Sequence, residues 1–317
     1  IHNTYKKEHN GMIYLRDEEA KRFSTTGTAI ALGKFDGIHV GHQMLIDGLM
    51  QEKQQGKTAL VFSFGDAPGS VLGGNVHKNI YTSEEKALYC EELGVDILLE
   101  YPFTREFAAM SPEEFVSHCL VQQLGVEAVY VGADFHFGKG RSGNVALLQA
   151  LGEEYGFTVH AVQKKTLHGK VVSSTTIRDM LESHFHIANE MLGNPYFVYG
   201  EVVHGQHLGH TIGFPTINQR VPGQKLVPAN GVYASRVEID GVTYRGISNL
   251  GKKPTVDGIH QVGLETYLLD YSGNLYGKKL KTQLLYFIRP EEKFANVESL
   301  RKQIQNDVKL MLEQDAY

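Results

Sequence analysis

The stretch ALGKFDGIHVGH, residues 31–42, joins an apolar run to a helical pattern. Thr28 to Leu32, just before the glycines, favour a β-strand, and Gln43 to Gln54 have the apolar spacing of an amphipathic helix. A strand that turns into a helix brings backbone N–H groups and the positive end of the helix to one point, which suits an anion. His39 and His42 add ring donors there. The stretch therefore predicts a phosphate site.

The rest of the first half alternates short apolar strands with amphipathic helices. This pattern is typical of right-handed βαβ crossovers and a parallel sheet, whose ligands bind at the carboxyl ends of the strands. Ser83 and Ser111 are predicted N-caps, with Pro112 and Glu114 completing the second helix start. The residues before Thr28 are expected to be polar, with one short helix at 17–23. Strands are expected at 28–32, 58–64, 95–100, 128–132 and 157–162, and helices at 43–54, 83–93, 111–124, 144–155 and 174–183.

The pattern changes after His184. A continuation of the preceding helix is expected at 187–192, and beyond Gly193-Asn194-Pro195 the strands are longer and more alternating, which predicts a mostly antiparallel sheet or small barrel. Asp240-Gly241 favours a hairpin turn. Strands are expected at 196–203, 231–239, 242–249, 262–269 and 279–288, with a closing helix at 297–313. We therefore expect two domains, residues 1–186 and 187–317.

Composition narrows the class of protein. The 317 residues carry a formal net charge of −5, so no overall basic field indicates a nucleic-acid partner. No apolar run is long enough to predict a membrane span. The two cysteines, Cys90 and Cys119, are far apart and not in a C-x-x-C pair, which favours a reducing compartment. We expect a cytoplasmic protein.

Two readings stay open for each candidate site in the first half. A His pair three residues apart is often two surface histidines or a metal pair, although no third ligand with zinc spacing is evident. The segment VSSTTIR, residues 172–178, places Ser174, Thr175 and Arg178 at the start of a helix. That arrangement favours an anion site, and it is also found in an ordinary capped helix.

The second half offers a candidate metal site and a candidate base. In GQHLGHTIGFPTIN, residues 205–218, Thr216 and Asn218 alternate along an extended chain and face the same way. Their neutral oxygens suit a magnesium ion balanced by a nucleotide, although an ordinary turn explains the stretch too. Glu265 lies in the apolar strand VGLETYLL, residues 262–269. Its carboxylate is either exposed to solvent or held as a general base.

Taken together, these stretches resemble the bacterial bifunctional riboflavin kinase/FAD synthetases over nearly the whole chain. The first half is similar to the adenylyltransferase domain, a branch of the HxGH nucleotidyltransferases, and the second to the riboflavin kinase domain. Further matching segments are YTSEEK (81–86), FAAMSPEEF (107–115), VGADFHFGKGRSG (131–143), NGVYA (230–234), SNLGKKPT (248–255) and FIRPEEKF (287–294).

For the first half, the resemblance implies a Rossmann-like domain in which the FMN phosphate attacks the α-phosphorus of ATP and pyrophosphate leaves. His39 and His42 are then catalytic, holding phosphate oxygens. The ATP-binding residues implied are Gly33, Phe35, Asp36, Gly41, Ser174, Thr175 and Arg178. The flavin-binding residues implied are Asp134, Phe137 and Arg141.

For the second half, the resemblance implies an antiparallel β-barrel with a closing helix, in which riboflavin is phosphorylated. Glu265 accepts the proton of the ribityl 5′-hydroxyl, and Thr216 and Asn218 hold Mg²⁺. The ATP-binding residues implied are Gly209, Thr211, Gly213 and Tyr233, and the flavin-binding residues are Asn249 and Arg289. ATP, riboflavin and FMN are the implied substrates, with Mg²⁺ as cofactor and FAD as the final product.

One segment departs from the family pattern. A Pro-His-Pro-type segment usually follows the second strand, but GDAPGS (65–70) stands here without the histidine, and Lys34 replaces a small amide. Two alternatives therefore stay open: a riboflavin kinase with a weak or specialised adenylyltransferase half, and a flavin-responsive binding protein. An HxGH transferase for another acceptor explains only the first half.

Overall fold

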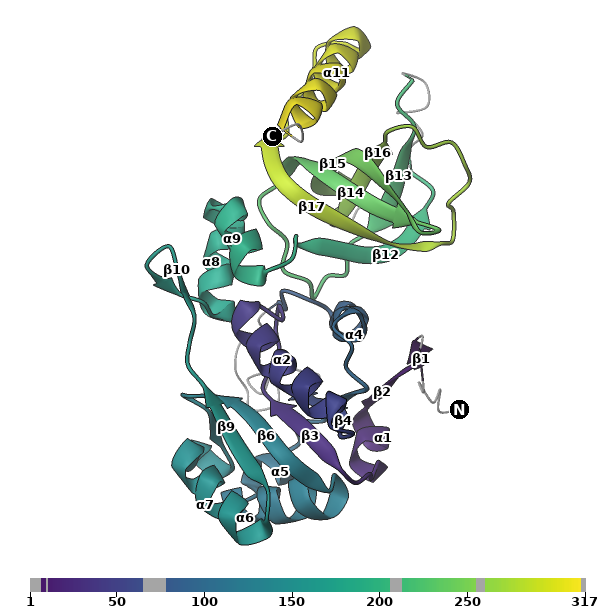
Figure 1. Ribbon diagram of the computed structural model, residues 1–317. Coiled ribbons are helices and arrows are strands. Elements are labelled where there is room, and N and C mark those ends of the chain that lie inside the picture. The colour runs from purple at the N-terminus through teal and green to yellow at the C-terminus, as the bar shows by residue number, and fades with distance from the viewer. Residues whose placement is uncertain (1–6, 10, 65–77, 206–212, 255–259, 315–317) are drawn as a thin grey trace. The chain divides into compact units, whose positions relative to one another are not determined.

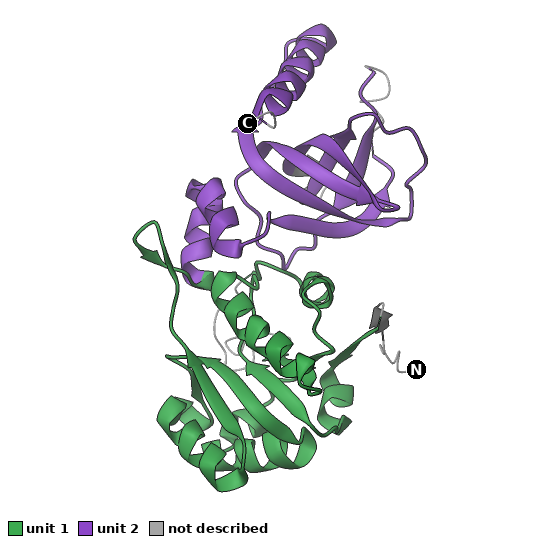
Figure 2. Cartoon of the chain, in the orientation of Figure 1, with its two compact units in different colours: residues 1–174 green, residues 175–317 purple. Residues whose placement is uncertain are grey.

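The structure is a computed structural model that describes residues 7–9, 11–64, 78–205, 213–254 and 260–314 (Figure 1). The chain divides into two compact units, residues 1–174 and 175–317 (Figure 2). Helix α8, Ser174–Ser183, begins at this division. The domain boundary that the sequence predicts, after residue 186, lies a little further on, within helix α9, Phe185–Leu192.

Among the described residues, the first unit contains a seven-stranded sheet in the order β1-β2-β5-β4-β3-β6-β9, parallel except for β1. β3 lies between β4 and β6, so the chain moves away from β3 in opposite directions along the sheet. Ligands bind at such a switch point, outside the carboxyl ends of the strands. The strands are β1 Lys7–His9, β2 Met12–Arg16, β3 Thr28–Leu32, β4 Thr58–Phe64, β5 Ile97–Tyr101, β6 Val126–Gly132 and β9 Thr158–Val162.

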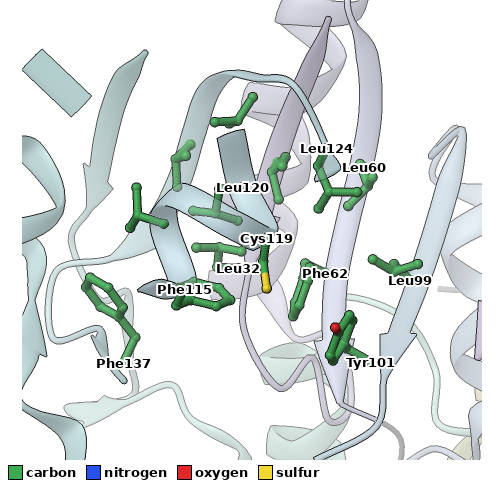
Figure 3. Close-up of a cluster of buried hydrophobic side chains, with 14 of the residues drawn as sticks. Leu32, Leu60, Phe62, Leu99, Tyr101, Phe115, Cys119, Leu120, Leu124 and Phe137 are labelled. Carbon is green, nitrogen blue, oxygen red and sulfur yellow. The ribbon is translucent and has the colours of Figure 1, made fainter. Parts of the chain in front are cut away.

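The two faces of β3 bury side chains of different size. Ile30 and Leu32 belong to a hydrophobic core cluster (Figure 3), which also contains residues of a π-helix at Phe115–Gln123. Ala29 and Ala31 alternate with them and are also fully buried. Helix α2, Val40–Gln54, contacts β3, β4 and β6. Small residues on that face of β3 let the helix approach closely, which fixes its N-terminus beside the end of β3.

Most predicted elements of the first unit are confirmed, but several details are corrected. Residues before Thr28 are not merely a polar segment, because β2 pairs with β5 inside the sheet and Met12, Tyr14 and Leu15 are buried. Helix α4, Ser83–Glu92, is capped by Thr82 rather than Ser83, since the Thr82 hydroxyl accepts the N–H of Glu85. The helix predicted at 111–124 splits into α6, Pro112–Glu114, and the π-helix.

The remaining elements of the first unit are short, apart from helix α7. Asn144 caps α7, and Ser111 forms the predicted capping box with Glu114. These elements are α1 Asp17–Arg22, α5 Arg105–Ala109, β7 His136–Phe137, a 3₁₀ turn Lys139–Arg141, β8 Gly143–Asn144, α7 Val145–Tyr155, β10 Thr166–Leu167 and β11 Lys170–Val171.

The described strands of the second unit form a closed antiparallel barrel in the order β12-β13-β16-β15-β14-β17, as the resemblance implies. Its interior contains bonded hydroxyls, with Ser248 Oγ 2.7 Å from both Ser235 Oγ and Thr266 Oγ1. Asp240 and Gly241 have φ of 50° and 81°, which confirms the predicted hairpin turn. The strands are β12 Phe197–Val203, β13 Thr216–Arg220, β14 Gly231–Ile239, β15 Val242–Pro254, β16 His260–Leu268 and β17 Lys279–Arg289.

Helices cover parts of this barrel. Helix α9 does not continue α8, because His184 between them has a non-helical backbone with φ −144° and ψ 68°. The Asn189 side chain of α9 donates to the carbonyls of Leu284 and Leu285 on β17. The predicted closing helix is α11, Val297–Gln314, whose buried Met311 belongs to a core cluster with residues of β14 and β15.

Candidate functional sites in the two units

The turn after β3 has an unusual backbone. Phe35 and Ile38 have φ of 50° and 40°, a left-handed region that bulky and β-branched residues rarely adopt. Both side chains are fully buried, so packing compensates for the strained backbone. Gly33 and Gly41 allow close approach, since a Cβ at either position would lie 3.2 Å from the ring of Phe35 or His39. Strain concentrated where a strand ends at the switch point of the sheet indicates a functional turn.

The two histidines form one stacked pair at the start of α2. Their ring centroids are 3.7 Å apart at 16°, and Phe35 packs against His42 with centroids 4.8 Å apart. His39 caps the helix, because its Nδ1 accepts the backbone N–H of His42 at 3.3 Å. This cap explains why α2 begins at Val40, three residues before the predicted start. In a neutral ring with an accepting Nδ1, Nε2 carries the proton and is a donor.

Burial keeps both rings neutral. It lowers the pKa of the His39 imidazole to about 4. It lowers the pKa of His42 well below its ordinary value; a protonated His39 and the positive charge of Lys86 lower that pKa further. His42 Nδ1 is buried and has no hydrogen-bond partner among the described residues. Neutral ring donors beside the positive end of a helix suit phosphate oxygens, and they bind as hydrogen-bond donors rather than as imidazolium acids.

The structure brings Asp36 and Ser174 together with this turn. The Asp36 carboxylate accepts the backbone N–H of Ile80 at 2.8 Å, and its carbonyl accepts the Ser174 hydroxyl at 2.8 Å. Ser174 is the last residue of the first unit, whereas Thr175 and Arg178 belong to the second. A phosphate role for those two residues stays a prediction.

The predicted flavin residues of the first unit differ in exposure. Phe137 is buried in the core and packs against Phe115 and Phe135, with ring centroids 5.8 and 5.6 Å apart. Asp134 is exposed, and its Oδ2 lies 2.7 Å from Lys164 Nζ; this hydrogen bond lowers the pKa of the carboxyl. Arg141 is also exposed. Flavin binding by Asp134, Phe137 and Arg141 stays a prediction, and residues 65–70 lie outside the described part of the chain.

In the barrel, the strand register places three predicted residues in one row. Asn218 on β13 lies opposite Glu265 on β16, which lies opposite Asn249 on β15. Directly opposed residues in antiparallel strands point to the same face. Their strand neighbours Thr266 and Ser248 are fully buried and bonded inside the barrel, so the row faces outward. All three residues of the row are half-buried.

The surroundings of this row fit a magnesium ion held with a nucleotide. Thr216 shares its face two residues along β13, and Asn218 lies so close to Gly205 that a Cβ there would lie 2.4 Å from the amide nitrogen. A hydroxyl and an amide oxygen are hard ligands, and Mg²⁺ usually takes few protein ligands with the rest from phosphates and water. Asn249 Nδ2 donates to Glu291 Oε1 at 3.2 Å, which adds a carboxylate that the sequence reasoning did not single out.

Other predicted residues of the second unit have structural contacts. The Tyr233 ring is fully buried and its hydroxyl donates to the Ala229 carbonyl. Arg289 forms a double hydrogen bond with the buried carboxylate of Asp307 on α11, at 2.9 to 3.1 Å. Gly213 is exposed with φ 83°. Gly209 and Thr211 lie outside the described residues. Nucleotide binding by Tyr233 and Gly213 and flavin binding by Arg289 stay predictions.

Comparison with known families matches both units. Residues 21–176 match the FAD synthetase family, and residues 192–314 match the riboflavin kinase family. The bifunctional riboflavin kinase/FMN adenylyltransferase of Haemophilus influenzae is 37% identical over 89% of this chain and 92% of its own length. The protein of that name from Escherichia coli K12 is 40% identical over 89% of this chain and 90% of its own length. The chain belongs to the bifunctional riboflavin kinase/FMN adenylyltransferase family.

A solved structure shares the fold of this family member. It covers 95% of the chain and 99% of its own length, with 28% identity and a TM-score of 0.81. That structure is of a protein from Streptococcus pneumoniae named as a macrolide-efflux protein. In the family member described here, no helix among the described residues is long and apolar enough to cross a membrane.

The sequence reasoning missed one buried group beside the histidine turn. Lys86 and Glu100 are both buried; Lys86 lies in a segment that matches the family without an assigned role, and Glu100 in one singled out only as a strand. A signal was present, because Glu100 lies within the otherwise apolar run ILLEY at 97–101. A carboxylate inside such a run predicts a buried partner, but it does not say which residue the partner is.

Proposed function

We propose that the chain phosphorylates riboflavin to FMN at the outward row of the barrel and adenylylates FMN to FAD at the histidine turn. The observation that supports this division is that each set of polar residues is assembled within one unit. The row Asn218–Glu265–Asn249 is set by strand register in the second unit, and the pair His39–His42 is set by the end of β3 in the first.

In the kinase reaction, the ribityl 5′-hydroxyl oxygen attacks the γ-phosphorus of ATP. The new O–P bond forms as the bond from the γ-phosphorus to the bridging oxygen breaks, and ADP leaves. Glu265 orients the hydroxyl and accepts its proton. Thr216 and Asn218 would hold Mg²⁺, which supplies positive charge to the phosphates. The general base therefore comes from the strand next to the metal ligands.

In the adenylyl transfer, a phosphate oxygen of FMN attacks the α-phosphorus of ATP, and pyrophosphate leaves. The attacking oxygen is already ionised, so no general base is needed. His39 and His42 donate hydrogen bonds to phosphate oxygens as neutral rings, and the N-terminus of α2 adds its positive dipole. Catalysis here is positioning with charge stabilisation.

A product assay tests the proposal directly. The full chain is incubated with riboflavin, ATP and Mg²⁺, and the flavins are separated by chromatography. We expect FMN to appear first and FAD to follow. FMN without FAD supports the alternative of a kinase with a weak adenylyltransferase half. Bound flavin without turnover of ATP supports a binding protein and contradicts both reactions.

We also propose a cytoplasmic location, with small-molecule partners and no nucleic acid. Cys90 and Cys119 are both free and buried, and the net charge of −5 does not favour a polyanion. Cell fractionation and an electrophoretic shift with DNA or RNA test the two statements. Recovery with the membranes, or a shift at physiological salt, contradicts them.

A further inference from the structure

A buried ion pair lies between helix α4 and the carboxyl ends of β4 and β5. Lys86 Nζ on α4 is 2.8 Å from Glu100 Oε1 on β5, and the two side chains are 6% and 0% exposed. Two charges are removed from water here, and loss of either partner would leave the other buried and uncompensated. The capping box between Thr82 and Glu85 fixes the first turn of α4 and with it the direction of Lys86.

A chain of hydrogen bonds links this pair to the histidine turn. Lys86 Nζ also bonds Ser63 Oγ at 3.1 Å, and Ser63 Oγ donates to the Lys34 carbonyl at 2.9 Å. Lys34 lies between Gly33 and Phe35, at the start of the strained turn. Just before α4, the Ile80 N–H binds the Asp36 carboxylate. Helix α4 and the segment that leads into it therefore hold the turn at two separate points.

The charge of Lys86 also acts on the histidine rings. Burial alone raises the pKa of Glu100, but the Lys86 charge and the hydrogen bonds from Lys86 and Tyr14 lower it overall, so the carboxylate is ionised. Among the described residues, the groups whose charge acts on the histidine rings are Asp36 and Lys86, besides the rings themselves. The positive charge of Lys86 opposes protonation of His42. The ring therefore stays neutral, with one nitrogen that donates a hydrogen bond and one that accepts.

We propose that Lys86, anchored on Glu100, is a positioning residue for adenylyl transfer that holds the histidine turn through Ser63 and through its charge. The proposal rests on the proposed function of the first unit. Lys86 is separated from the turn by Ser63 and does not itself need to touch ATP. Its loss is expected to lower the rate of the chemical step more than the affinity for flavin.

The test removes both charges of the pair at once. The double variant Lys86→Met/Glu100→Gln leaves no unpaired buried charge and keeps an acceptor for the Tyr14 hydroxyl. A second variant, Ser63→Ala, removes the hydroxyl that joins Lys86 to the Lys34 carbonyl and leaves the ion pair with Glu100 in place. The matched control is Lys57→Met/Glu52→Gln, a pair at the far end of α2 that likewise has a tyrosine hydroxyl, that of Tyr130, on its second oxygen.

Formation of FAD from supplied FMN is measured with all chains, and formation of FMN from riboflavin shows that the second unit is intact. We expect kcat for FAD formation to fall about 10- to 100-fold in the first double variant, with KM for FMN changed by less than about threefold. In Ser63→Ala, kcat for FAD formation is expected to fall several-fold. NMR titration of the His42 ring should show a raised pKa in Lys86→Met/Glu100→Gln only.

Each outcome has a distinct meaning. The proposal stands if kcat for FAD formation falls and the pKa of His42 rises in Lys86→Met/Glu100→Gln, while both quantities keep their parent values in the control variant. If FAD formation by both test variants stays within twofold of the parent chain, the proposal is overturned and the pair is only structural. If Lys86→Met/Glu100→Gln does not fold, Ser63→Ala decides alone. If the parent chain makes FMN but no FAD, the adenylyltransferase assignment itself has failed.

Discussion

The histidine turn and the barrel row are two ways of holding polar groups for phosphate chemistry. In the turn, His39 and Asp36 are buried and His42 is half-buried, the backbone is strained at Phe35 and Ile38, and the contacts come from distant segments. In the row, Asn218, Glu265 and Asn249 are half-buried and lie on regular strands. The first site is held by long-range packing and the second by register. Their responses to mutation and pH should differ accordingly.

Substitution of Glu265 should give the largest effect and should be confined to one reaction. Glu265→Gln keeps the shape and the strand but cannot accept the hydroxyl proton, so FMN formation should fall by about 10²- to 10⁴-fold. FAD formation from supplied FMN should stay within twofold of the parent. Both rates are measured by chromatography. Asn218→Ala should show the same selectivity, and equal loss of both activities would contradict two separate centres.

Substitution of His42 should give the opposite selectivity. His42→Asn removes one ring of the stacked pair, so FAD formation should fall by about 10²- to 10³-fold because a donor to the developing charge is lost. FMN formation from riboflavin is the control and should be unchanged. A variant that still makes FAD at the parent rate would show that the turn is not the adenylylation centre.

The contrast between the two sites also explains what the sequence could predict. Thr216 and Asn218 are found from their spacing, because a period of two decides which side chains of a strand share a face, and Glu265 is found as a carboxylate in an otherwise apolar strand. The anion site at residues 31–42 is found from glycines and histidines between a strand and a helix. Both site predictions depend on residues that are close together in sequence or lie on one regular element.

What the sequence could not predict lies in contacts between distant segments. Asp36 with Ile80, and Lys86 with Glu100 and Ser63, join residues that only the folded sheet brings together. The start of α2 was placed three residues late because a histidine is not an expected N-cap. The strand Met12–Arg16 was missed because its neighbours are polar and its partner β5 is over 80 residues away.

A smaller effect is expected at Arg289, where the structure shows an ion pair and the resemblance implies flavin binding. Arg289→Met leaves the fully buried Asp307 carboxylate unpaired, which should destabilise the second unit by about 3–5 kcal/mol. The double variant Arg289→Met/Asp307→Leu should recover most of this loss, as thermal unfolding will show. A raised KM for riboflavin in the stable double variant would show that Arg289 contributes to flavin binding. An unchanged KM would show that Arg289 serves only to anchor α11.

The smallest effect should be a loss of stability of the first unit at acid pH. The unfolded chain protonates His39 near its ordinary pKa of about 6.5, whereas the folded chain does so only near about 4. The unfolded state therefore binds more protons between these values. The free energy of unfolding should be at its full value above pH 6.5 and should fall by about 3 kcal/mol as the pH drops to 4. Hydrogen exchange of α2 amides, corrected for intrinsic rates, measures this fall.

The control variant His39→Asn keeps a side-chain cap without a titrating ring. Its loss of stability should be smaller, because only the His42 contribution remains. An equal fall in both chains would mean that His39 is not held neutral by burial.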